Sequence, residues 1–200
     1  MIDNPFRERL PKFTGPIIRL YKVLRLTPNQ ITVLALITSI AAAYLVSVKY
    51  FMGAAAIWWV GRLFDGTDGI YARSTGQTSS FGAFLDILFD MASYSIMIVG
   101  FYFAFPNLVT AWIVILFLYI LCITGALSLG SLEDKNKVPG RDNRGLRLAA
   151  GIAEGGETGI AYTLFLIFPA KIEIFVRAWI LVLFITVVAR TILAGREIKS

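Results

Sequence analysis

The chain has 200 residues, of which 57% are hydrophobic and 16% charged, with a net charge of +6 and a mean hydropathy of +0.72. Soluble domains average roughly 25% charged residues, so this composition excludes an ordinary soluble domain and favours a single membrane-embedded bundle. The absence of histidine excludes histidine-based general base catalysis, Ser-His-Asp hydrolysis and histidine-ligated zinc.

Residues 1–30 form a predicted cytoplasmic and interfacial segment. Apolar residues recur there at helical spacing with basic residues between them: Ile17, Ile18, Leu20, Tyr21 and Leu24 alternate with Arg19, Lys22 and Arg25. Such a helix would bury its apolar face in the membrane interface and direct its basic face at anionic headgroups. A short soluble helix packed on the bundle is the alternative. Pro28 should end this helix and begin the next one, because proline disfavours helix at the preceding residue and suits a first turn.

Six apolar segments follow, and each approaches the length of about 20 residues that a membrane span requires. They cover about residues 32–49, 52–73, 81–104, 109–132, 147–168 and 173–193. We therefore predict an all-α integral membrane protein with six transmembrane helices preceded by an amphipathic interfacial helix. Residues 1–200 should form a single membrane-embedded domain.

The basic residues are segregated along the chain. The short turns between spans carry only Lys49 and Lys171, whereas the N-terminal segment, the polar loop at 134–145 and the C-terminus carry many more. The positive-inside rule then places both termini in the cytoplasm. We expect the protein in the inner membrane of the cell, among membrane lipids, and the basic residues require no nucleic acid as a partner.

Four aspartates interrupt the second and third predicted spans, namely Asp65, Asp68, Asp86 and Asp90. An ionised carboxylate at bilayer depth costs about 3 kcal/mol or more by insertion scales, so four of them require a neutralising cation. The first two are three residues apart and the last two are four apart, so each pair shares one helix face. Two facing helices would therefore bring four carboxylates together near the cytoplasmic surface.

Carboxylate oxygens in that number suit hard divalent cations such as Mg²⁺ or Mn²⁺, which typically also coordinate substrate phosphates. Two ions would offset the four negative charges, and two-metal sites are common in phosphoryl chemistry. The predicted ligand is a phosphate or pyrophosphate compound, with Arg73 available to contact it. Asp90, the deepest of the four along the third span, is the candidate base for an attacking hydroxyl. Small residues keep the helices close and leave backbone exposed for a ligand, at Gly69, Ala72 and Gly82.

The residues from Asp65 to Asp90 read D-x2-D-G-x2-A-R-x8-G-x3-D-x3-D. Every fixed position of this string matches the motif of the CDP-alcohol phosphotransferases, and the chain resembles that family over essentially its whole length. The resemblance implies a cytoplasmic-side site that takes CDP-diacylglycerol, or another CDP-linked alcohol. The enzyme would transfer the phosphatidyl group to the hydroxyl of a small polar alcohol and release CMP. Family members are commonly homodimers.

The resemblance also implies a role for each motif residue. Asp65, Asp68 and Asp86 would hold the metals, and Asp90 would bridge the ions or act as the base. The CMP and diphosphate site would be lined by Gly69, Ala72, Arg73 and Gly82.

The sequence indicates the acceptor alcohol less clearly than it indicates the donor. Relatives that use phosphorylated acceptors tend to carry extra arginines near the cytoplasmic ends of later spans, and the end of the fourth span here has none. Arg141 and Arg144 could bind an anionic acceptor. The more ordinary interpretation is that both residues lie in a solvated loop and contact no acceptor. Glu154 and Glu157 share one helix face and could hydrogen-bond a polyol or attract an amine, or could equally face water. Arg62, one turn before Asp65, could support the acidic cluster electrostatically or contact lipid.

Three other interpretations of the aspartates are open. A cation-coupled transporter could use the same carboxylates as an ion site. Transporters often show paired repeats and broken helices near the midplane, whereas these acids lie toward one face, so an enzyme is favoured. Purely structural aspartates are disfavoured because structure alone would not require four converging carboxylates. The intact motif also argues against a relative that has lost catalysis.

Overall fold

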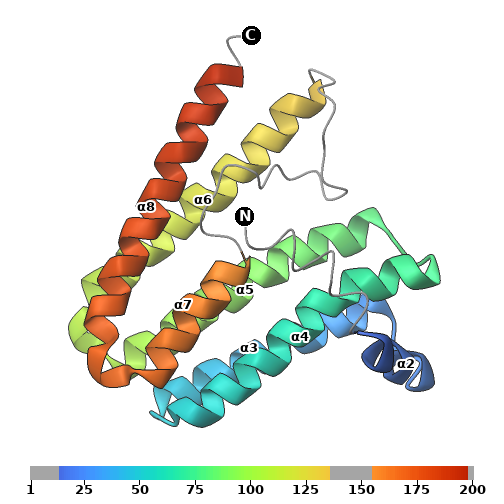
Figure 1. Ribbon diagram of the computed structural model, residues 1–200, viewed down its shortest axis with the longest axis horizontal. Coiled ribbons are helices and arrows are strands. Elements are labelled where there is room, and N and C mark those ends of the chain that lie inside the picture. Colours follow the sequence, from blue (N-terminus) through green and yellow to red (C-terminus); the bar gives the residue numbers. More distant parts are fainter. Residues whose placement is uncertain (1–13, 136–154, 198–200) are drawn as a thin grey trace.

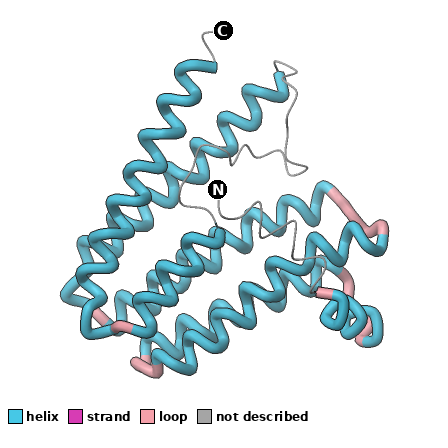
Figure 2. Tube along the Cα trace, in the orientation of Figure 1, coloured by secondary structure: helices cyan, strands magenta, loops and turns pink. Residues whose placement is uncertain are grey.

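A computed structural model describes residues 14–135 and 155–197, and these residues form helices joined by short turns, with no strand among them (Figure 2). The predicted all-helical class is confirmed. The helices are α2 (Gly15–Val23), α3 (Pro28–Ser47), α4 (Phe51–Thr75), α5 (Ser80–Ala104), α6 (Val109–Lys135), α7 (Gly155–Ile167) and α8 (Ile172–Glu197). Two 3-10 turns, η1 (Pro106–Leu108) and η2 (Pro169–Lys171), stand where the sequence predicts tight connections between spans.

Four helical segments are long and apolar enough to cross a bilayer: Pro28–Ser47, Ser80–Ala104, Pro106–Ser131 and Pro169–Gly195. Helix α4 has 25 residues, but its charged side chains lower its hydropathy below that of these four. Helix α7 is described over 13 residues, and residues 147–154 of the fifth predicted span lie outside the described part of the chain. The count of six spans therefore stays a prediction.

The helices form two groups (Figure 1). Helices α4 and α5 both pack against α3, and α7 lies against α4. Helices α6 and α8 run side by side and diverge from the first group toward the C-terminus (Figure 1). Aromatic side chains fill the core where the groups meet, and the largest of them are Trp58, Phe101, Trp112, Tyr162 and Phe165.

Helix α3 approaches its neighbours closely because small residues face it. A Cβ atom added at Gly100 of α5 would lie 2.5 Å from the backbone oxygen of Ala43. One added at Gly61 of α4 would lie 2.7 Å from the hydroxyl of Thr38. Small residues at helix interfaces allow this close packing in membranes. The motif-bearing helices α4 and α5 are thus both held against α3.

We expect Gly100→Ala to destabilise the protein by about 1–3 kcal/mol, because the new methyl group meets backbone that cannot rotate away. Gly125→Ala in α6 is the matched control, since a Cβ there meets no described residue within 4 Å. That control should be neutral or stabilising by up to about 1 kcal/mol, through helix propensity. Thermal unfolding in detergent measures both changes, and equal unfolding temperatures for the two variants would contradict the close α3–α5 contact.

Helix α2 ends before Pro28, as the sequence predicts. Thr27 and Gln30 form a capping box, in which the Thr27 hydroxyl accepts from the Gln30 backbone and the Gln30 side chain accepts from the Thr27 backbone. Pro28 occupies the first turn of α3. Sequence reasoning found this boundary because the effect of proline is local.

Helix α2 packs on the bundle through Tyr21, which is 2% exposed and contacts Ile31 and Tyr71. Its hydroxyl lies 2.8 Å from the Thr67 hydroxyl of α4. Burial raises the pKa of Tyr21, so this hydroxyl stays protonated. Three apolar side chains of α2 and its C-cap residue remain exposed, at Leu20, Val23 and Leu24. The helix therefore packs on the bundle and still presents an apolar surface, and its place in the membrane interface stays a prediction.

A chain of buried hydrogen bonds joins four helices to one another. The Trp179 indole donates to the Tyr119 hydroxyl at 3.0 Å, and Tyr119 donates to the Tyr162 hydroxyl at 3.0 Å. Tyr162 donates in turn to the backbone oxygen of Tyr94 at 2.9 Å. The Tyr94 hydroxyl donates to Asp90 at 3.2 Å. This chain ties α8, α6 and α7 to the part of α5 that carries one of the motif aspartates.

Candidate active site

Three of the four predicted carboxylates converge between α4 and α5. Asp65 comes from α4, and Asp86 and Asp90 come from α5. One oxygen of each lies within 4.8 Å of the others, and all three residues are partly buried. Among the described residues, this is the group of acidic side chains with the spacing of a metal site.

A tight turn between the two helices produces this convergence. Helix α4 ends at Gly76, whose φ of 67° is a left-handed conformation that glycine adopts without a Cβ penalty. Ser79 then caps α5 by accepting from the Gly82 backbone at 3.0 Å. The chain reverses within a few residues, so the two halves of the motif face each other.

Asp68 is placed differently from the other three aspartates. It is 5% exposed, and the Thr32 hydroxyl of α3 donates to its Oδ2 at 2.5 Å. Its Oδ1 accepts from the Gly69 backbone at 2.5 Å. Asp68 therefore contacts α3 and is not part of the group of three. The sequence carries no signal for the Thr32 contact, because the two residues lie 36 positions apart on different helices.

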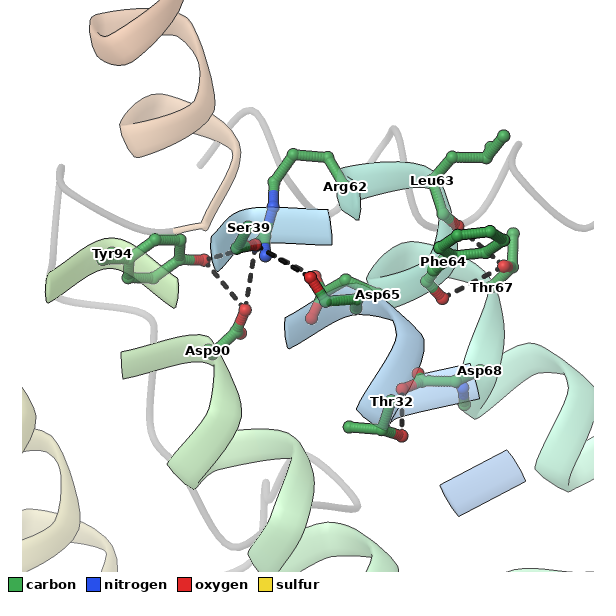
Figure 3. A network of polar contacts seen from close by, with 12 residues as sticks. Thr32, Ser39, Arg62, Leu63, Phe64, Asp65, Thr67, Asp68, Asp90 and Tyr94 are labelled. Carbon is green, nitrogen blue, oxygen red and sulfur yellow. Dashed lines mark hydrogen bonds and ion pairs between the residues drawn. The ribbon is translucent and has the colours of Figure 1, made fainter. Parts of the chain in front are cut away.

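Arg62 contacts the cluster directly (Figure 3). Its Nη1 donates to Asp90 Oδ1 at 2.9 Å and lies 3.4 Å from Asp65 Oδ2. The same nitrogen donates to the Tyr94 hydroxyl at 3.2 Å. The Arg62 side chain is 8% exposed, so electrostatic support of the cluster is confirmed and lipid contact is excluded.

The three carboxylates fit a divalent cation. Carboxylate oxygens are the ligands that Mg²⁺ and Mn²⁺ prefer, and two ligands about 2.1 Å from one ion lie about 3–4 Å apart. Small side-chain rotations would bring the three clustered oxygens onto a shared ion. The donor set and its spacing are therefore those of a hard-metal site.

The predicted nucleotide-lining residues flank this cluster on the same two helices. A Cβ at Gly69 would lie 3.3 Å from Arg73 Nη1, so the glycine lets that guanidinium fold back over the α4 backbone. A Cβ at Gly82 would lie 3.1 Å from the side-chain oxygen of Asn29 at the start of α3. Ala72 is buried and Arg73 is exposed. Their contact with a nucleotide stays a prediction.

The start of α7 lies beside the cluster. A Cβ at Gly155 would lie 3.0 Å from the Tyr94 hydroxyl, which donates to Asp90. Glu157 stands in the first turn of α7 and is partly buried. Three further predicted acceptor residues lie outside the described part of the chain: Arg141, Arg144 and Glu154.

Apolar helices of spanning length and a carboxylate cluster for a hard cation together define a metal-binding integral membrane protein. The chain matches the model of the CDP-alcohol phosphatidyltransferase family over residues 25–196 and belongs to that family. It is therefore a transferase of phospholipid biosynthesis, as the motif predicts.

Two curated relatives are similar over most of the chain. The chain is 28% identical over 175 residues to the inner membrane protein YnjF of Escherichia coli, covering 85% of this chain and 84% of that protein. It is 32% identical over 172 residues to the archaetidylinositol phosphate synthase of Pyrococcus horikoshii, covering 84% and 86% respectively.

The fold is also that of solved structures of a phosphatidylinositol phosphate synthase from Mycobacterium tuberculosis. The structure in complex with manganese and citrate aligns with a TM-score of 0.68 at 23% identity, covering 91% of this chain and 88% of that one. The structure with CDP-DAG bound also aligns with a TM-score of 0.68, at 22% identity, covering 92% and 94%. At this identity the likeness shows the shared fold.

Proposed function

We propose that the protein transfers a phosphatidyl group from CDP-diacylglycerol to the hydroxyl of a small polar alcohol and releases CMP. The convergence of Asp65, Asp86 and Asp90 between two motif-bearing helices carries this proposal. A similarly folded synthase with CDP-DAG bound supports the choice of donor. A different CDP-alcohol is the alternative donor within the family.

Asp65, Asp86 and Asp90 are the proposed ligands of one Mg²⁺ or Mn²⁺ ion, and Asp68 is the proposed ligand of a second. The manganese-containing neighbour supports a divalent metal here. When bound, such ions neutralise charge that develops on the diphosphate oxygens during transfer. Thr32 orients Asp68 by donating to one of its oxygens. The donor's nucleotide and diphosphate would lie along Gly69, Ala72, Arg73 and Gly82.

Asp90 is the proposed base. Arg62 and Tyr94 both donate to its Oδ1, so the carboxylate has a defined orientation. Asp90 accepts the proton of the acceptor hydroxyl as that oxygen bonds to the phosphorus next to the lipid. The bond between this phosphorus and the CMP oxygen breaks, and CMP leaves.

We place the acceptor at the start of α7, because this helix begins beside Tyr94. Glu157 and Glu154 would hydrogen-bond a polyol there, and Arg141 and Arg144 would contact a phosphate on it. The names of the matched synthases support an inositol phosphate among the acceptors to be tested.

Further parts of the proposal rest on charge and family resemblance. The positive-inside rule supports a site and termini that face the cytoplasm. The family resemblance supports a homodimer.

An acceptor screen tests the proposed reaction. Purified protein with CDP-diacylglycerol and Mg²⁺ or Mn²⁺ should release CMP when offered one of serine, inositol, inositol phosphate, glycerol phosphate or choline. The same mixture with a chelator is the control and should release none. CMP release that depends on one alcohol identifies the acceptor. No CMP release from folded, metal-loaded protein with any of these alcohols would contradict the proposal and favour a different CDP-alcohol as the donor.

A further inference from the structure

Arg62 places a positive charge in direct contact with the acidic cluster, and the family motif does not include this residue. It stands one turn before Asp65 on α4 and reaches across to Asp90 on α5 (Figure 3). Among the described residues, one nitrogen, Nη1, makes the three polar contacts of Arg62, to these two carboxylates and to the Tyr94 hydroxyl. The guanidinium therefore connects the two helices that supply the cluster.

The guanidinium is held in place by two aromatic rings. Its central carbon lies 4.6 Å from the ring centroid of Trp58 and 5.1 Å from that of Tyr94. Both rings are buried, at 0% and 3% exposure. Arg62 Nε and Nη2 are buried with no hydrogen-bond partner among the described residues, and cation–π contact with the rings offsets part of that cost. The two rings therefore hold the guanidinium beside the carboxylates.

The positive charge of Arg62 affects how strongly the acidic cluster attracts a cation. Asp65, Asp86 and Asp90 bring three acidic groups together, and the positive charge of Arg62 is in contact with two of them, Asp65 and Asp90. Without Arg62 the same carboxylates would attract a divalent ion more strongly, because a positive charge in contact with two of them repels any further cation.

We propose that Arg62 is a positioning residue that orients Asp65 and Asp90 and limits the affinity of the cluster for its metal. This inference rests on the proposed role of the three carboxylates as metal ligands. A merely structural ion pair predicts the opposite effect on metal binding, because loss of the pair would disorder the carboxylates and weaken binding. The sign of the change in metal affinity therefore distinguishes the two roles.

Arg62→Met tests the inference, because methionine keeps apolar contact with Trp58 and Tyr94 and removes the charge. Mn²⁺ binding to purified protein is measured by electron paramagnetic resonance of the free ion. We expect Arg62→Met to bind Mn²⁺ at least about tenfold more tightly than the wild type. Turnover should fall, because Asp90 loses a donor that orients it.

Two further variants complete the design. Arg62→Lys keeps the charge and loses the planar guanidinium, so Mn²⁺ affinity should stay within about threefold of the wild type while turnover is partly retained. Arg177→Met is the matched control, because Arg177 is exposed and pairs with Glu173 on α8, and Mn²⁺ affinity should not change. Equal or weaker Mn²⁺ binding by folded Arg62→Met would overturn the inference.

Removing a buried cation leaves its carboxylate partners uncompensated, so Arg62→Met is also expected to unfold at a lower temperature without metal. Added Mn²⁺ should then raise its unfolding temperature by more than it raises that of the wild type. An equal rise in both proteins would contradict the inference even if little of the variant folds without metal. Failure of the wild type to bind Mn²⁺ would instead contradict the proposed ligands.

Discussion

Asp90→Asn should lower turnover by about a thousandfold or more, while the protein still binds the CDP-linked substrate. Asparagine has nearly the same shape, and its amide oxygen can still accept from Arg62 and Tyr94. The amide cannot take up a proton from the acceptor hydroxyl. The fold and the donor site should therefore survive while the proton transfer fails. Steady-state CMP release measures turnover, and calorimetric titration with the donor measures binding.

Glu173→Gln is the matched control for this change. It is the same carboxylate-to-amide substitution at an exposed residue near the start of α8, remote from the cluster in sequence and contacts. Turnover of the control should equal that of the wild type. Activity retained by Asp90→Asn would remove Asp90 from the base role and leave it as a metal ligand at most.

Asp65→Ala should weaken metal and donor binding together. The variant loses one of the three clustered oxygens. It also removes one of the two carboxylates that offset the positive charge of Arg62. We expect Mn²⁺ affinity to fall by about a hundredfold or more, which exceeds the tenfold to hundredfold loss typical of outer-shell partners of metal ligands. Mn²⁺ titration and donor titration at a fixed metal concentration measure the two losses.

Asp68→Ala should also weaken metal and donor binding, although Asp68 lies outside the group of three and is held by Thr32. If Asp68 holds a second ion, the variant should still bind one Mn²⁺ with an affinity near that of the wild type. The number of bound ions should then fall from two to one. Unchanged metal dependence in both variants would count heavily against the assignment of these aspartates as ligands.

The spacing of Asp86 and Asp90 was sufficient to predict that these two residues share one face of α5. Helical periodicity is a local property, and the turn between α4 and α5 is short, so the meeting of Asp65 with Asp86 and Asp90 could be foreseen. The break before Pro28 could also be predicted, because proline restricts the residue just before it. Apolar length likewise indicated the membrane helices.

The partners of these aspartates could not be foreseen in the same way. Asp68 was expected to join the other three, yet it is turned toward Thr32, 36 positions away. The side chain of Arg62 had two possible surroundings, lipid or the acidic cluster, and helical periodicity does not distinguish them. Burial against Trp58 and Tyr94 decides between them.

The sequence motif was sufficient by itself to predict the family and a site for a hard divalent cation. That motif consists of the four aspartates, their spacing and the small residues around them. Only the tertiary structure decided that three carboxylates share one site, that Asp68 is held by α3, and that a buried arginine lies among them. The physical reason is the range over which each effect acts. Helix faces and turns are set by neighbours in sequence, whereas the charges around the site depend on side chains that α4 and α5 bring together and that α3 contacts.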